Sequence, residues 1–149
     1  MLGTREVIDG LFAAAATGEV EPVLRWWADD GVLDDITLAR RYSGKAELRP
    51  YLEMYYRAFP QLTYEPSLLL IDGSSAMVEW AQVTRLEGTF DGLPGDGREL
   101  RLRAVDLFEI RDGLVVHESS WYGDGWLRQR LQDPHPELLP APLPRGEAW

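Results

Sequence analysis

The sequence predicts an α+β domain in which helices come first and a strongly curved antiparallel sheet follows. Apolar residues recur with helical spacing up to residue 59 and with strand spacing from residue 62 to residue 121. The chain has 149 residues, 45% of them hydrophobic, which suits one domain with a sizeable core. A twisted sheet wrapped around three N-terminal helices forms a cone-shaped barrel, and such a cone can hold a pocket.

The first two predicted helices are short and amphipathic. Apolar side chains recur at helical spacing over residues 4–16, with Thr4 at the N-cap and Gly18 as the stop. Pro22 suits the first position of the second helix, because its missing N–H needs no partner there. The turn sequence at residues 29–31 is expected to close that helix.

An extended segment and a third helix follow. Residues 32–37 are predicted to be extended, and Ser43 is predicted to cap the third helix. The apolar residues of this helix continue at helical spacing up to Phe59. Pro50 lies inside the segment, so the helix is either kinked there or begins there.

Strands are predicted after Pro60, and two short turn sequences connect them. Asp72-Gly73 and Asp112-Gly113 are typical of tight hairpins, so they pair the flanking strands antiparallel. Residues 91–97 form a longer loop at one end of the sheet. The four predicted strands span residues 62–71, 75–87, 100–110 and 114–121.

The C-terminal part divides into a closing helix and a tail. A short helix is predicted over residues 125–131, after the last strand. Five of the ten prolines lie within residues 133–149, which predicts an extended segment. Apolar leucines between those prolines predict that the tail packs on the domain or on a second copy. We therefore expect a domain over residues 1–132 and a proline-rich tail over residues 133–149.

Composition excludes several kinds of function. The absence of cysteine excludes disulfides, thiolate nucleophiles and cysteine-based metal sites. The only histidines are His117 and His135, which excludes a histidine-rich metal site. A net charge of -10 disfavours nucleic acids and anionic membranes as partners, and no apolar run reaches the length of a membrane span. We expect a cytoplasmic protein that binds a small, largely apolar molecule.

Asp106 is the most informative polar residue. With strand alternation it shares a face with Leu100, Leu102, Ala104 and Phe108, all of them apolar. Burial raises the pKa of a carboxyl, which makes it a proton donor or a general base near neutral pH. A structural role, in which the carboxyl caps a backbone group or pairs with a buried arginine, is about equally consistent with the pattern.

The other acidic groups give weaker signals. Asp34 and Asp35 lie in an extended stretch and point to opposite faces, so only one can face a pocket. Asp124 fits the N-cap of the closing helix. His117, on a strand, is expected to be a hydrogen-bonded structural histidine. The tryptophans are mostly core residues, but a pocket lined by a few of them would suit a flat, apolar ligand.

Several short motifs stand out along the chain: Ala28-Asp29-Asp30-Gly31-Val32-Leu33-Asp34-Asp35, Tyr42-Ser43-Gly44, Phe59-Pro60, the loop at 88–98, Val105-Asp106-Leu107-Phe108 and Arg111-Asp112-Gly113-Leu114-Val115. In this order they resemble a known family, the SnoaL-like polyketide cyclases. This family belongs to the nuclear transport factor 2-like superfamily, which also contains the ketosteroid isomerases. The resemblance covers residues 4–131 and leaves the tail unmatched.

The resemblance implies roles for individual residues. Asp35 matches the general base of the isomerases, and Asp106 matches their oxyanion-hole acid or the polar partner residue of the cyclases. The oxyanion-hole tyrosine of the isomerases falls on Leu11, a departure from their scheme. The cyclase acid that follows an aromatic pair falls on Gly123 by count, one residue before Asp124. The glycine-rich stretch at 93–97 also departs from the usual loop.

Together these observations predict a cofactor-independent acid–base enzyme that acts on a small, largely apolar carbonyl compound. The reaction would be an intramolecular aldol-type cyclisation or a related isomerisation, with Asp35, Asp106 and Asp124 as catalytic residues and no metal. A homodimer through the outer sheet face is also expected. The predicted substrate contacts are Trp27, Tyr55, Trp80, Phe108, Trp121 and Tyr122.

Two alternatives stay open from the sequence. Asp35 could pair with Glu65 or Glu79 to open an epoxide, one acid activating water and the other protonating the oxygen. A non-catalytic ligand-binding or dimerisation module is the other, because this superfold changes function freely. Two carboxylates that converge in a closed pocket would favour an enzyme.

Overall fold

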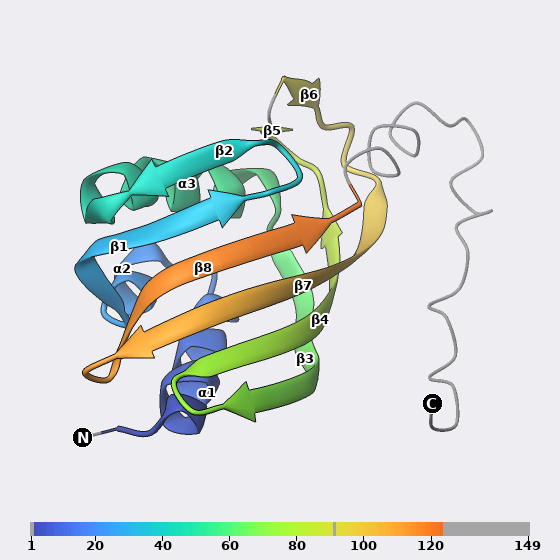
Figure 1. Cartoon of the computed structure of the whole chain (residues 1–149). Helices are drawn as coiled ribbons and strands as arrows, with labels where there is room; N and C mark the ends of the chain where they lie inside the picture. The colour runs from blue at the N-terminus through green and yellow to red at the C-terminus, as the bar shows by residue number, and fades with distance from the viewer. Residues whose placement is uncertain (1, 91, 124–149) are drawn as a thin grey trace.

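The computed structural model describes residues 2–90 and 92–123. Asp124, the predicted closing helix at 125–131 and the predicted tail at 133–149 lie outside the described residues. The described part is a curved main sheet with helices packed against its concave face, and a separate two-stranded sheet at residues 89–90 and 93–94 (Figure 1). The predicted fold class, an α+β cone with a curved sheet, is confirmed.

All three predicted helices are present: α1 (Thr4–Ala15), α2 (Val20–Leu24) and α3 (Gly44–Ala58). The predicted N-cap of α1 is wrong by one residue, because Gly3 is the N-cap and the Thr4 hydroxyl instead donates to the Gly73 carbonyl, at 2.8 Å. Pro50 lies inside α3, which begins six residues earlier, so the helix does not start at the proline.

The second helix ends earlier than predicted. It stops at Leu24, and Trp27 already begins strand β1 (Trp27–Asp35), so residues 29–31 do not close a helix. Trp27 is buried in the core, and the pairing of β1 with its neighbour shifts between Trp27 and Val32. This bulge absorbs Asp29 and Asp30, whose polar sequence had suggested a turn.

The main sheet has six strands in the order β2-β1-β8-β7-β4-β3. Its hairpins at Asp72-Gly73 and Asp112-Gly113 are those predicted. The expectation of an entirely antiparallel sheet is wrong at one position, because β1 pairs with β8 in parallel. Besides β1, the main sheet contains β2 (Arg40–Ser43), β3 (Gln61–Asp72), β4 (Ser75–Arg85), β7 (Glu99–Arg111) and β8 (Leu114–Tyr122). The short strands β5 (Thr89–Phe90) and β6 (Leu93–Pro94) pair with each other.

The parallel pair follows from the path of the chain. β1 turns back into β2, a short polar strand that the sequence analysis did not predict. β8 then returns after the long hairpins and lies between β1 and β7 (Figure 1). The first and last long strands therefore meet in the middle of the sheet.

Two apolar clusters hold the helices against the sheet. The larger joins α1 and α2 to the concave face, where Phe12 and Phe108 pack edge to face with ring centroids 6.1 Å apart. The smaller cluster surrounds Phe59 and Phe90 at the end of α3. The cavity described below is lined by residues of both clusters.

Candidate active site

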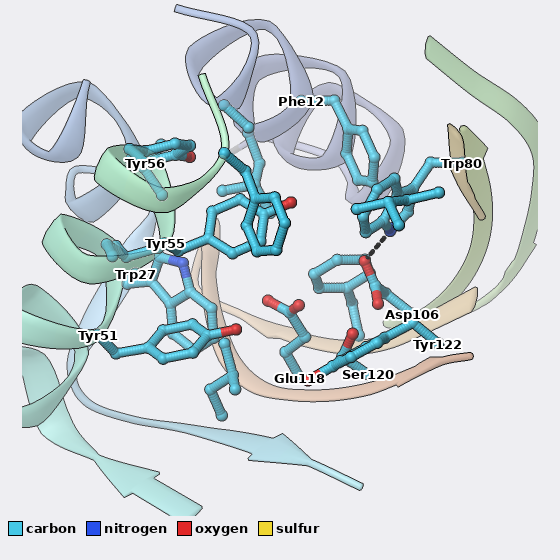
Figure 2. A pocket seen from close by; sticks show the side chains of 18 of the residues that line it. Phe12, Trp27, Tyr51, Tyr55, Tyr56, Trp80, Asp106, Glu118, Ser120 and Tyr122 are labelled. Carbon is cyan, nitrogen blue, oxygen red and sulfur yellow. Dashed lines mark hydrogen bonds between the residues drawn. The ribbon is translucent and has the colours of Figure 1, made fainter. Parts of the chain in front are cut away.

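A cavity of about 120 Å³ lies between the helices and the concave face of the sheet (Figure 2). Its wall is mostly apolar and aromatic, with contributions from all three helices and five strands. Asp106, Glu118 and Ser120 open on it from β7 and β8, and Arg103 of β7, which pairs with Glu79, also lines it. The aromatic lining comprises Phe12, Trp27, Tyr51, Tyr55, Tyr56, Phe59, Trp80, Phe90, Phe108 and Tyr122.

Asp106 is 4% exposed and reaches the cavity from the middle of β7, as the alternation predicted. Trp80 Nε1 donates a hydrogen bond to Asp106 Oδ2, and Ser120 lies opposite Asp106 on β8. Oδ1 is buried and has no hydrogen-bond partner among the described residues. Burial raises the pKa of Asp106 to about 7, against the lowering effect of the hydrogen bonds from Ser120 and Trp80.

Glu118 is a second acid in the same cavity, and the sequence analysis did not identify it. Its carboxyl points into the cavity from β8 (Figure 2), and Phe108 is its cross-strand neighbour. No hydrogen bond to this carboxyl is found within residues 2–90 and 92–123. Burial raises the pKa of Glu118 well above its ordinary value, and the nearby Asp106 and Asp35 raise it further.

A bulge near Val116 explains why the sequence did not reveal Glu118. Ile110 pairs with Val115, but Glu109 pairs with His117, so Val116 is an extra residue in β8. Without the bulge, strict alternation from the buried Val115 would turn Glu118 to the outer face. The sequence carries no glycine or proline signal at this position.

Asp35 is 1% exposed but is not part of the cavity wall. Its carboxylate accepts hydrogen bonds from the Tyr122 hydroxyl at 2.7 Å and from the Leu38 N–H at 2.9 Å. Tyr122 itself lines the cavity. Asp35 therefore lies behind Tyr122, close enough for its charge to raise the pKa of both Asp106 and Glu118.

The predicted substrate contacts divide by strand face. Trp121 does not line the cavity and is 42% exposed, because its neighbours Ser120 and Tyr122 point inward and successive strand residues alternate. This corrects its expected position. The other five predicted contacts line the cavity: Trp27, Tyr55, Trp80, Phe108 and Tyr122.

The end of β8 departs from the cyclase pattern. Gly123, the position assigned to the cyclase acid by count, lines the cavity without offering a side chain. Asp124 lies outside the described residues, so its predicted catalytic role stays a prediction. The two acids that the structure brings together are Asp106 and Glu118.

Tyrosines of α3 bring hydroxyl groups to the cavity. Leu11 lines the wall at the position matched to the isomerase tyrosine, and it cannot donate a hydrogen bond. Burial raises the pKa of Tyr51, Tyr55 and Tyr56, so these phenols keep their protons. The Tyr55 hydroxyl donates to Gln82 Oε1 at 2.8 Å.

The remaining acids lie away from the cavity. Asp34 is on the opposite face from Asp35 and pairs with Arg41 at 2.7 Å and His117 at 2.8 Å, which gives His117 the structural role expected of it. Glu79 pairs with Arg103, and Glu65 is exposed. Neither glutamate lines the cavity, so the structure does not assemble the paired acids of the epoxide-opening alternative.

The described residues contain neither a metal-binding cluster nor a helix that could span a membrane. No group of three or more His, Asp or Glu side chains among them is arranged to hold a metal ion. No helix in the same part of the chain is long and apolar enough to cross a membrane.

Several solved structures share the fold of this chain. A candidate polyketide cyclase of Pseudomonas putida KT2440 has 23% identity and a TM-score of 0.74, covering 87% of this chain and 98% of that one. A SnoaL-like polyketide cyclase of Agrobacterium tumefaciens has 14% identity and a TM-score of 0.72, with 88% and 99% covered. A protein with a ketosteroid isomerase-like fold from Catenulispora acidiphila has 12% identity and a TM-score of 0.68, with 80% and 86% covered. The chain thus has the ketosteroid isomerase-like fold.

Sequence comparison identifies the family. The model of the SnoaL-like domain matches residues 8–118, and the chain therefore belongs to the SnoaL-like family. No functionally curated protein matches the sequence significantly. The resemblance inferred from the motifs is confirmed.

Proposed function

We propose that this protein is a cofactor-independent enzyme that transfers protons on a small, largely apolar carbonyl compound. The reaction class would be an intramolecular aldol-type cyclisation or a related isomerisation. Membership of the SnoaL-like family supports this class. The observation that carries the proposal is the convergence of two carboxyls, the buried Asp106 and the half-buried Glu118, on one apolar cavity. Such convergence favours an enzyme over a binding module.

The two acids suit different halves of the proton transfer. A pKa of about 7 leaves part of Asp106 ionised at neutral pH, so it can remove a proton from the carbon next to a carbonyl. The pKa of Glu118 lies well above its ordinary value, so this acid stays protonated and can donate a hydrogen bond to the enolate oxygen. Asp106 then returns its proton to the product.

The sheet places these groups at a useful separation. Asp106 is opposite Ser120, and Glu118 is two residues away on the same strand and the same face. Diagonal neighbours of this kind have Cα atoms roughly 7 Å apart, which leaves room for a carbonyl carbon and its oxygen between the carboxyls. The aromatic wall around them limits water, which strengthens both interactions.

Deuterium exchange tests the proposal without knowledge of the natural substrate. 1-Indanone, a flat apolar ketone, would be incubated with the protein in D2O, and loss of its α-proton signals would be followed by NMR. We expect exchange above the buffer rate, reduced at least about 100-fold in Asp106→Asn and about 10-fold in Glu118→Gln.

The matched control is Asp34→Asn, the same chemical change on the outer face. It should retain wild-type exchange, because Asp34 is paired with Arg41 and His117 away from the cavity. Exchange that persists in Asp106→Asn, or that falls equally in Asp34→Asn, would contradict the assignment.

We also propose a homodimer through the outer sheet face. Apolar side chains that are more than two-fifths exposed lie on this face, on β3, β7 and β8: Leu68, Leu70, Leu107 and Trp121. An exposed apolar patch on a sheet favours association. Light scattering should give the mass of a dimer for the wild type and of a monomer for Leu107→Glu. A wild-type monomer would contradict this proposal.

A further inference from the structure

We infer that Asp35 is a positioning residue, which fixes Tyr122 in the cavity wall and holds a negative charge behind the two cavity acids. It would not exchange a proton with the substrate, unlike the base to which it was matched by resemblance. This inference rests on the proposed function, since it concerns the same cavity.

Two hydrogen bonds hold the Asp35 carboxylate in place. Both carboxylate oxygens are engaged, Oδ2 by the Tyr122 hydroxyl at 2.7 Å and Oδ1 by the Leu38 N–H at 2.9 Å. The residue is 1% exposed and does not line the cavity. A base must reach the proton that it removes, and Asp35, which is bonded to the hydroxyl of the wall residue Tyr122, does not itself open on the cavity.

A further set of hydrogen bonds ties the same loop to the same tyrosine. Thr37 Oγ1 donates to the Tyr122 carbonyl at 2.9 Å and accepts from the Tyr122 N–H, also at 2.9 Å. The Ile36 N–H donates to the Ser120 carbonyl at 3.0 Å. The turn that follows β1 is therefore hydrogen-bonded to the end of β8. Asp35 adds the hydrogen bond to the Tyr122 side chain.

The charge of Asp35 also acts on the two cavity acids. Among the described residues, the ionisable groups around Asp106 are Asp35 from β1, Tyr55 from α3 and Glu118 from β8, and no positively charged side chain in this part of the chain contributes to its pKa. Arg103 also lines the cavity, but it pairs with Glu79. The charge of Asp35 raises the pKa of Asp106 and that of Glu118. Removing this charge should lower the pKa of both acids, so that Asp106 becomes a weaker base at neutral pH.

The test compares two neighbouring substitutions, Asp35→Asn and Asp34→Asn. The carboxyl carbon of Asp106 would be titrated by NMR in both variants and in the wild type, with no substrate present. We expect its pKa to fall by about 0.5 or more in Asp35→Asn and to change by less than about 0.2 in Asp34→Asn. No fall in Asp35→Asn, or an equal fall in both variants, would overturn the inference.

Tyr122→Phe separates the two parts of the role. It removes the hydroxyl but keeps the charge of Asp35, so the Asp106 titration should stay near that of the wild type. The KM for 1-indanone exchange should rise several-fold, while kcat changes less, because the wall of the cavity is loosened. A large change in the Asp106 titration in this variant would contradict the role assigned to the charge.

A measurement on the wild type covers the case in which Asp35→Asn does not fold. The Asp35 carboxyl carbon should show an ionised group throughout the pH range in which Asp106 titrates. Proton uptake by Asp35 in that range would overturn the inference. Because the titrations need no turnover, they distinguish a failure of this inference from a failure of the proposed function, which would appear as absent exchange.

Discussion

The two faces of the sheet shift the pKa of aspartate and glutamate side chains in opposite directions. Asp34 and Asp35 are consecutive residues of β1, yet Asp34 lies on the outer face beside Arg41 and His117, and Asp35 is buried behind the cavity. The hydrogen bond from Arg41 holds the pKa of Asp34 below its ordinary value. On the inner face, burial raises the pKa of Asp106 and Glu118. The environment supplied by strand alternation decides in which direction the pKa of an acid shifts.

The partners explain this contrast. Two acids of the outer face pair with arginines, Asp34 with Arg41 and Glu79 with Arg103. Within the described residues, Asp106 accepts a hydrogen bond from the neutral Trp80, and no hydrogen bond reaches the Glu118 carboxyl. A neutral donor compensates part of the cost of burying a carboxylate, and the remainder appears as a raised pKa. An acid with that imbalance is ready for proton transfer at neutral pH.

The largest expected effect is the dependence of stability on pH, which comes from the inner face. The pKa of Asp106 is about 7 in the folded protein and 3.8 in an unperturbed side chain. Between about pH 4 and pH 7 the unfolded chain has therefore released a proton that the folded protein still holds. The free energy of unfolding should fall as the pH rises through this range, by roughly 4 kcal/mol from Asp106 alone.

Asp106→Asn should remove that part of the decline. Urea unfolding at pH 5, 6, 7 and 8, followed by tryptophan fluorescence, would show a flatter dependence in the variant, with its advantage over the wild type growing towards pH 8. Glu118 keeps some slope in both proteins, because its pKa is raised as well. A wild-type stability that rises between pH 5 and pH 8 would contradict the raised pKa assigned to the acids of the inner face.

A smaller effect is expected from Trp80→Phe, which removes the donor to Asp106. Because this hydrogen bond favours the ionised carboxylate, its loss should raise the pKa of Asp106 above 7, by about 0.5 to 1. The rate of 1-indanone exchange should then reach its plateau at higher pH. Trp121→Phe, on the outer face, is the matched control and should leave the pH profile unchanged. An unchanged profile in Trp80→Phe would show that the tryptophan does not tune the acid.

The smallest effect should come from the outer face. Asp34→Asn removes the ion pair with Arg41 and the hydrogen bond with His117, and the pair is exposed on the arginine side. We expect a loss of about 1 kcal/mol or less in the free energy of unfolding at pH 7, reduced by salt. Because the pKa of Asp34 is lowered on folding, this contribution is present above pH 4 and disappears as the pH falls below it. A loss as large at pH 2 as at pH 7 would contradict the ion-pair origin.

Local sequence signals predicted much of the fold and one of the cavity acids. The Asp-Gly hairpins, the three helices and the inward position of Asp106 depend on residues near one another in the chain, so periodicity revealed them. The pairing of β1 with β8 depends on residues more than 80 positions apart, which no local pattern encodes. The strand β2 is short and polar, so it has no apolar alternation to detect.

The acids of the site also divide into those that local sequence signals reveal and those whose position depends on the packed structure. Glu118 faces inward only because of the bulge near Val116, and a bulge without glycine leaves no mark in the sequence. For Asp35, alternation showed that it and Asp34 face opposite sides, but the resemblance could not show that Tyr122 would stand in front of it. Orientation relative to a ligand is a property of the packed structure and not of a motif.

The central place of β8 sets an order for assembly during synthesis. Because β8 is the last strand of the described sheet to leave the ribosome and lies between β1 and β7, the β1-β2 hairpin stays separate from β3, β4 and β7 until residues 114–122 emerge. Glu118, Ser120 and Tyr122 all arrive on that strand. A nascent chain halted before residue 114 would thus lack the strand that joins β1 to β7, and the proton transfer proposed for the cavity would require that translation of this strand is complete.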